Sequence, residues 1–387
     1  MQEGEAGMKA ITNATIVMRD HLIPNGYLVI EEGKIAGFGE MRSGHLPEGC
    51  ETIDAGGLFV GPGLIDIHTH ASDRVFFIDD PVTVAQYHMR AGTTTVLPAL
   101  YFSMDQSGFL DAIRTINAAM ADPRCKNIAG LYMEGPYLNP KFGCDKENNP
   151  WRAPVNRADY LPIVEAAKNL ARVWALAPER EGIMDYVRDV RAACPDAVFA
   201  VAHSEAEPFQ MEPLLPLGLR IGTHHTDATG TIQKYPEVKG VCVDEFVNYH
   251  REMYAELICD SRGIHVDPFM LRLVRKIKGD DRIILISDAY ASDGPIPPGY
   301  DGVNDINFDW EGEIAGSKLT LNVAMRNMMK HTGASIVDVF GYASRNPAEA
   351  VGFHDRGEIA VGKRADLIVT DYNMNVKTTI IEGEVQP

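Results

Sequence analysis

The sequence lacks any hydrophobic run that approaches the roughly 18 consecutive apolar residues needed to cross a membrane. Its start, Met1–Gly7, is polar and acidic and is not followed by the apolar core of a secretory signal. The 6 cysteines are far apart and form no Cys-X-X-Cys pair, which argues against a thiolate zinc site and against a disulfide framework. We therefore predict a cytoplasmic protein with reduced thiols.

Positive charge is also scarce. The chain has 36 lysines and arginines against 54 aspartates and glutamates, a formal net charge of −18. This balance argues against nucleic acid or an anionic membrane as the main partner. An anionic small molecule stays possible because it needs only a local cluster of donors. The charge balance therefore favours a small-molecule partner.

The two ends of the chain share a β-rich pattern. Short runs that mix Val and Ile with polar residues occur at Lys9–Met18, Gly26–Glu31, Lys34–Gly39 and Cys50–Asp54, and again at Gly357–Val361, Asp366–Thr370, Val376–Ile381 and Gly383–Val385. The most economical arrangement is one small β-sandwich domain from residues 1–60 and 353–387, with residues 61–352 inserted as a separate catalytic domain.

The inserted part alternates strand and helix patterns. Strands are predicted at Leu64–His70, Thr94–Leu100, Ile128–Glu134, Arg172–Ala177, Val198–His203, Arg220–His224, Ala255–Asp260 and Ile283–Asp288. Helices between them include Pro81–Ala91, Asp105–Ala121, Arg157–Leu170, Gly182–Ala193 and Asp267–Lys278. Eight such units predict an α/β fold with a closed (β/α)₈ TIM-like barrel. An open doubly wound sheet is the alternative, although the Gly-rich dinucleotide fingerprint is absent. Residues 290–316 are predicted to be a long loop over the barrel mouth.

The stretch Gly61–His70 carries the clearest chemical signal. A Gly-Pro-Gly turn leads into an apolar run that ends in His68-Thr69-His70. Alternate residues of a strand face the same side, so both imidazoles can reach one divalent ion. Two solvated histidines at a strand end are the alternative, but the apolar approach favours metal.

Other ligand-type side chains also lie at or just beyond predicted strand ends. They are Glu134, His203, His224, His225, Asp260, His265 and Asp288. In such a barrel the chemistry sits at the carboxyl ends of the strands. Glu134 or Asp288 could instead cap a helix, and His203 could be a satisfied core residue. Consecutive His224 and His225 face opposite ways, and the periodicity does not settle which one enters the barrel.

These residues resemble those of the amidohydrolase superfamily and, more closely, its N-acetylglucosamine-6-phosphate deacetylase family. The matching motifs span nearly the whole chain and include Gly61–His70, Glu134-Gly135-Pro136, Leu176-Ala177-Pro178-Glu179, His203-Ser204, Thr223-His224, Gly263–Val266 and Ser287-Asp288-Ala289. The resemblance implies the roles of the strand-end residues. Glu134, His203 and His224 would hold the principal metal, His68 and His70 a second ion, Asp288 would be the general acid/base and His265 would meet the substrate.

The resemblance further implies one or two divalent ions, a homodimer, and an amino-sugar substrate such as N-acetylglucosamine 6-phosphate or a close N-acetylhexosamine. Zinc, iron and manganese all suit such ligands, with zinc the first choice. On the substrate side the chain departs from the family. Asp227 replaces a neutral Asn before Ala228, Lys234 lies near the family's arginine, and Lys141–Asp145 replaces Lys-X-Gly-Ala-His. A negative charge where a phosphate is expected favours an altered sugar specificity.

Two other functions remain open. One is a different amidohydrolase reaction, on a cyclic amide or another N-acyl substrate. The other is a non-catalytic binding protein on the same scaffold, but such a protein is expected to lose Asp288 or a ligand, and none is lost. Metal-dependent hydrolysis of an N-acetyl amide is therefore the predicted function.

Overall fold

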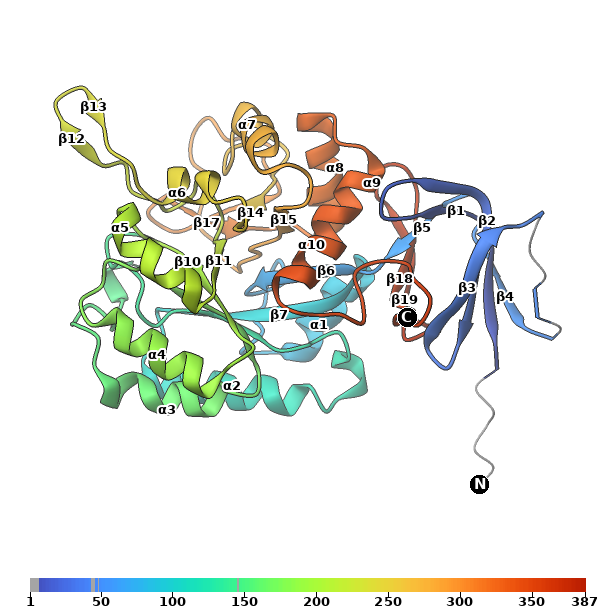
Figure 1. Cartoon of the computed structure of the whole chain (residues 1–387), viewed down its shortest axis with the longest axis horizontal. Helices are drawn as coiled ribbons and strands as arrows, with labels where there is room; N and C mark the ends of the chain where they lie inside the picture. Colours follow the sequence, from blue (N-terminus) through green and yellow to red (C-terminus); the bar gives the residue numbers. More distant parts are fainter. Residues whose placement is uncertain (1–6, 43–45, 48, 145) are drawn as a thin grey trace.

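The computed structural model describes residues 7–42, 46–47, 49–144 and 146–387. The predicted Asp145 departure and all but the last residue of Met1–Gly7 lie outside these ranges. Figure 1 shows a barrel of strands surrounded by helices and, beside it, a small sheet near both ends of the chain. In the described part of the chain, no helix is both long and apolar enough to span a membrane.

The barrel is an eight-stranded parallel sheet whose strands neighbour one another in chain order. The strands are β6 (Leu64–Thr69), β7 (Thr93–Tyr101), β8 (Leu131–Glu134), β9 (Ala171–Leu176), β10 (Val198–Val201), β11 (Leu219–Gly222), β14 (Tyr254–Ile258) and β15 (Ile283–Ile286). The last strand meets the first just past its end, where the Asp288 backbone N–H donates to His68 O at 2.9 Å. The eight strands are buried along nearly their whole length, which explains why their residues are mostly apolar. The predicted (β/α)₈ barrel is confirmed.

Three of the long helices around the barrel begin just after an aspartate that caps them. Asp80, Asp105 and Asp267 each accept a hydrogen bond from a backbone N–H of the following turn. The helices are α1 (Pro81–Arg90), α2 (Gln106–Ala119), α3 (Arg157–Ala167), α4 (Ile183–Ala193), α5 (Pro208–Met211), α6 (Val243–Tyr249), α7 (Pro268–Lys278), α8 (Leu321–Thr332), α9 (Ile336–Phe340) and α10 (Asn346–Ala350).

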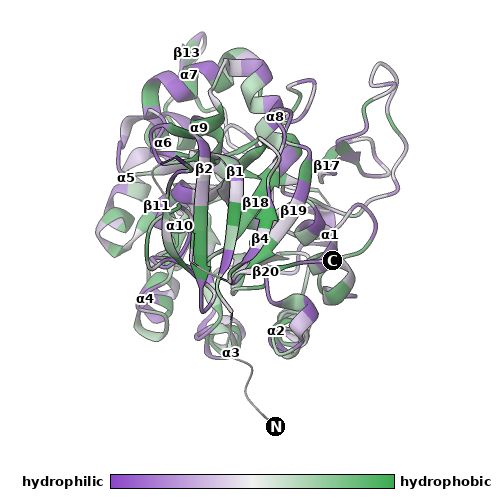
Figure 2. Ribbon diagram, turned by 90° about the vertical axis from the view of Figure 1, so that its right-hand side faces the viewer, coloured by the Kyte–Doolittle hydropathy of each residue, from purple (hydrophilic) through white to green (hydrophobic). Residues whose placement is uncertain are grey.

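Both chain ends contribute to one further sheet of eight strands, seen face-on in Figure 2. Its strands are β1 (Lys9–Val17), β2 (Leu22–Glu31), β3 (Lys34–Glu40), β4 (Glu51–Asp54), β5 (Phe59–Pro62), β18 (Leu367–Thr370), β19 (Val376–Ile381) and β20 (Glu384–Val385). The two ends join where β18 pairs antiparallel with β5. Side chains such as Ile11, Leu28 and Leu367 form a separate apolar core under this sheet.

The structure differs from the sequence prediction in several segments. The predicted Gly-Pro-Gly turn is wrong, because Gly61 and Pro62 end strand β5, where they pair with β18, and Gly63 alone separates β5 from β6. The predicted strand Gly357–Val361 is wrong, because these residues form bends and a turn in which Gly357 has φ 90° and packs against Ala348 and Ser344. The predicted loop 290–316 contains an antiparallel pair, β16 (Ile306–Phe308) and β17 (Ile314–Ser317). A second hairpin, β12 (Gln233–Tyr235) and β13 (Val238–Lys239), was not predicted and projects away from the barrel in Figure 1.

Candidate metal centre

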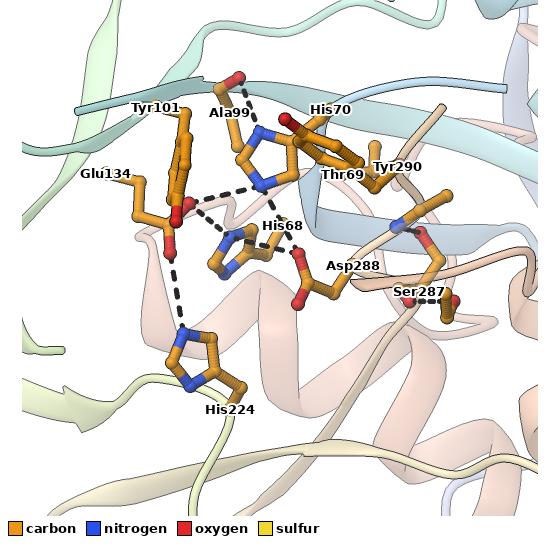
Figure 3. Close-up of polar contacts among 12 residues, drawn as sticks. His68, Thr69, His70, Ala99, Tyr101, Glu134, His224, Ser287, Asp288 and Tyr290 are labelled. Carbon is orange, nitrogen blue, oxygen red and sulfur yellow. Dashed lines mark hydrogen bonds and ion pairs between the residues drawn. The ribbon is translucent and has the colours of Figure 1, made fainter. Parts of the chain in front are cut away.

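The five predicted metal ligands meet inside the carboxyl end of the barrel. His68 lies on β6 and His70 directly follows it, and Glu134 is the last residue of β8. His203 follows β10, and His224 follows β11. All five side chains are buried. Figure 3 shows Glu134 between the imidazoles of His68 and His70 and that of His224.

One oxygen of Glu134 faces the histidines that follow β10 and β11. Glu134 Oε1 lies 2.8 Å from His203 Nε2 and 3.4 Å from His224 Nε2, and these two nitrogens are 3.1 Å apart. Ligand atoms placed tetrahedrally at 2.0–2.1 Å from one ion are about 3.3 Å apart. The three atoms therefore have the mutual spacing of ligands that share a metal.

The other oxygen of Glu134 faces His68 and His70. His70 Nε2 lies 3.1 Å from Glu134 Oε2 and 3.2 Å from Asp288 Oδ1. His68 Nε2 lies 3.4 Å and 3.6 Å from the same two oxygens. These four atoms form a second set with ligand spacing, so Glu134 is positioned to contribute one oxygen to each set.

The outer nitrogens of three of these imidazoles face oxygen atoms. His70 Nδ1 lies 3.1 Å from the Ala99 carbonyl, and His224 Nδ1 lies 3.2 Å from the Asp227 carbonyl. His68 Nδ1 lies 3.3 Å from Glu256 Oε2. Each Nδ1–H can therefore donate outward, which leaves the Nε2 lone pair directed at the centre. Within the described part of the chain, the buried atoms His68 Nε2 and Glu134 Oε2 have no hydrogen-bond partner, so the residues present fit one or two divalent ions.

The backbone is unusual at three of these positions. His203, His224 and Asp288 have φ values of 42°, 29° and 46°. Residues other than glycine seldom adopt this left-handed region, and such strain is concentrated at functional sites. Each is the second residue beyond the end of its strand, and all three line the cavity at the mouth of the barrel.

The pKa values of the clustered carboxylates and imidazoles depend on one another. Burial alone would raise the pKa of Glu134, but the facing His68, His203 and His224 lower it well below its usual range. Burial alone would lower the pKa of His68, but Glu134 and Asp288 raise it well above its usual range. Metal ligands must be deprotonated, so a bound cation would replace these protons as the partner of the carboxylates.

His265, the predicted substrate contact, is held by the carboxylate that follows β14. Asp260 Oδ2 accepts hydrogen bonds from the backbone N–H groups of Ile264 and His265, both at 2.9 Å, and lies 3.3 Å from His265 Nδ1. Burial alone would lower the pKa of His265, but the hydrogen bond to Asp260 raises it. His265 lines the cavity, and its buried Nε2 has no hydrogen-bond partner among the described residues.

A cavity of about 250 Å³ opens above the ligand cluster. Its wall includes Tyr101, Asp227, Ala228, His265 and Tyr290. The predicted substrate residue Lys234 is not part of this wall, because it lies on the β12–β13 hairpin and pairs with Glu207. His224 points inward, whereas His225 is directed away, with its Nε2 3.3 Å from Asn248 Oδ1.

Sequence reasoning missed residues that support the ligands. Glu256 lies in the middle of β14, is fully buried and faces His68. The Tyr132 ring stacks on His68 with ring centroids 4.3 Å apart, and the Tyr101 ring meets His70 edge-on at 5.6 Å. The available signal was a single carboxylate inside the apolar run Tyr254–Ile258, in mid-strand, whereas the predicted ligands lie at strand ends.

Comparisons with known proteins agree with this geometry. Residues 261–385 match the Amidohydrolase family. N-acetylglucosamine-6-phosphate deacetylase from Bacillus subtilis is 25% identical over 97% of this chain and 96% of its own. N-acetylgalactosamine-6-phosphate deacetylase from Escherichia coli O157:H7 is 27% identical over 84% of this chain and 86% of its own. The crystal structure of N-acetylglucosamine-6-phosphate deacetylase from Pasteurella multocida superposes with a TM-score of 0.85, at 25% identity and covering 98% of this chain and 99% of that one.

Proposed function

Because this chain belongs to the amidohydrolase superfamily and to its N-acetylglucosamine-6-phosphate deacetylase family, we propose that it hydrolyses the N-acetyl amide of an amino sugar and releases acetate. The observation that carries this proposal is the division of the two Glu134 oxygens between two sets of ligand atoms, directly below a cavity of small-molecule size.

We propose that Glu134, His203 and His224 hold the principal ion and that His68, His70 and Asp288 complete a second site. Bound there, a divalent ion would supply Lewis acidity, which can lower the pKa of water from about 15.7 to about 7 and polarise a carbonyl. Zinc is the first candidate for these histidine and carboxylate ligands.

The chain's own residues would manage the protons of the reaction. Asp288, whose pKa is held low by its histidine neighbours despite burial, would accept a proton from the attacking water and return it to the amide nitrogen as the C–N bond breaks. His265, kept protonated by Asp260, would donate from Nε2 to the carbonyl oxygen as negative charge develops on it. The products are acetate and the free amine.

Acetate release is the direct test. The metal-loaded protein should release acetate from N-acetyl amino sugars, lose this activity on chelation and regain it when the metal is restored. A cyclic amide such as hydantoin tests the alternative amidohydrolase reaction. Ring opening of the cyclic amide without acetate release from any N-acetyl sugar would contradict the proposal.

Two further expectations belong to the same proposal. The chain is expected to act as a homodimer in the cytoplasm, with no nucleic acid or membrane partner. Sedimentation of the purified protein would measure its oligomeric state.

A further inference from the structure

We propose that Asp227 makes the cavity select substrates that present an uncharged or cationic hydrogen-bond donor, and no phosphate, to this residue. This inference rests on the proposed deacetylase function and names the substrate class for the same site. The donor is a hydroxyl or an ammonium group, because both can donate a hydrogen bond to a carboxylate oxygen.

Asp227 is placed to act on the substrate. Its backbone N–H donates to His224 O at 2.8 Å, and its carbonyl oxygen lies 3.2 Å from His224 Nδ1. The tight turn after β11 therefore fixes the residue beside a proposed metal ligand. Its side chain belongs to the cavity wall, and its buried Oδ2 has no hydrogen-bond partner among the residues that the structure describes. A buried, unpaired carboxylate oxygen is costly unless something donates to it, and the substrate is the available donor.

The lysines of the cavity wall are already paired. Among the described lining residues the lysines and arginines are Lys141 and Lys146 alone. Lys141 Nζ lies 2.6 Å from Glu205 Oε2, and Lys146 Nζ lies 2.8 Å from both carboxylate oxygens of Glu313. A phosphate would have to displace Glu205 or Glu313 to gain a lysine partner, and His265 alone does not supply the several donors that recognition of phosphate needs.

The predicted phosphate-side cation is also engaged elsewhere. Lys234 lies on the exposed β12–β13 hairpin, where it forms an ion pair with Glu207 outside the cavity wall. Of the wall's carboxylates, Glu134 and Asp288 face the proposed metals and Glu313 pairs with Lys146, while Asp227 belongs to neither ligand set. Asp227 is therefore the wall carboxylate left to meet the substrate.

The test is kcat/KM of the metal-loaded enzyme for N-acetylglucosamine, its 6-phosphate, and the analogue with an amino group at position 6. We expect kcat/KM for at least one of the two unphosphorylated compounds to be at least about tenfold higher than kcat/KM for the 6-phosphate. The reason is that a phosphate facing Asp227 would bring two negative charges together, which is strongly unfavourable. Asp227→Asn should shrink that preference by about tenfold. Asp196→Asn, an exposed residue at the opposite end of the barrel just before β10, makes the same charge change outside the cavity and should leave the ratio unchanged.

A measurement without variants guards against misfolding. Calorimetric titration of the wild-type holoenzyme with glucosamine and with glucosamine 6-phosphate should give tighter binding of the unphosphorylated amine. A preference for the 6-phosphate in turnover or in binding, or a preference unchanged by Asp227→Asn, would overturn the inference while leaving the deacetylase function intact. Absence of acetate release from every compound would instead reject the proposed function, and the inference with it.

Discussion

The imidazole of His68 and the carboxylate of Glu256 meet beneath the proposed metal centre, with His68 Nδ1 3.3 Å from Glu256 Oε2. Both side chains are fully buried. The same oxygen lies within hydrogen-bonding distance of the His224 backbone N–H, at 3.4 Å, and of the Tyr132 hydroxyl, at 3.5 Å. One carboxylate in mid-strand thus orients His68 and contacts the turn that presents His224.

This relationship predicts the effect of Glu256→Gln. An amide lacks the charge that strengthens the bond to His68 Nδ1, and loss of such outer partners weakens metal affinity by about 10–100-fold. We expect weaker occupancy of the site that includes His68 and His70, measured by metal titration. Exposed Glu212→Gln is the matched control. Unchanged affinity in Glu256→Gln would remove this positioning role.

Asp288→Asn tests the proposed proton transfer. The substitution keeps the shape and an oxygen ligand but removes the proton acceptor, so turnover should fall by about 10²–10⁴-fold. Metal held by Glu134, His203 and His224 should stay bound, as metal analysis of the same sample would show. Near-normal turnover would exclude Asp288 from the mechanism.

The barrel and most of the ligand cluster could be predicted because their signals are local. β6 was expected at Leu64–His70 and is observed at Leu64–Thr69, and β15, expected at Ile283–Asp288, ends at Ile286. Apolar runs that end in histidine or carboxylate identify strand ends, and parallel strands bring their carboxyl ends together in a barrel. Glu134 and His203 therefore lie close together, because both are at the carboxyl ends of parallel barrel strands.

Features that depend on distant contacts could not be predicted. The pairing of Glu256 with His68 joins residues far apart in sequence, and nothing near Glu256 indicates it. The β12–β13 hairpin is polar and exposed, with Lys234 paired to Glu207 and Lys239 to Glu245, so it carries no hydrophobic period. Whether His224 or His225 enters the barrel depends on the left-handed turn at His224, which side-chain alternation does not describe.

The close packing around Gly63, the single residue between β5 and β6, predicts the effect of a substitution there. A Cβ at Gly63 would lie 2.1 Å from Thr94 Oγ1 and 2.4 Å from its Cγ2, in the buried interior. Overpacking of this kind costs about 1–3 kcal/mol, so Gly63→Ala should lower the free energy of unfolding by that amount. Urea unfolding of the two proteins measures this difference. Gly37→Ala in β3, where a Cβ meets nothing within 4 Å, is the control. Equal stability of the two variants would contradict this packing.

His88 predicts a pH dependence of stability. The side chain is fully buried, its Nε2–H donates to the Ala71 carbonyl at 2.8 Å, and burial lowers its pKa to about 4 from 6.5. The unfolded chain therefore binds a proton between these values that the folded chain does not. Its contribution to stability is complete above pH 6.5 and declines as the pH falls towards 4.

His88→Gln measures this contribution. Between about pH 7.5 and about pH 5, the wild type should lose about 2 kcal/mol more unfolding free energy than the variant. Urea unfolding of the two metal-saturated proteins at both pH values gives this difference directly. An equal loss in both proteins would mean that His88 does not stay neutral in the folded state.

Glu134 is proposed to join the histidines into the metal site that carries the reaction, and Glu134→Ala removes this link. Metal content and acetate release should be measured together on this variant. We expect Glu134→Ala to lose most of its bound metal and all measurable acetate release, while the exposed Glu212→Ala retains both. Full metal occupancy in Glu134→Ala, or acetate release at the wild-type rate, would show that Glu134 does not hold the catalytic metal.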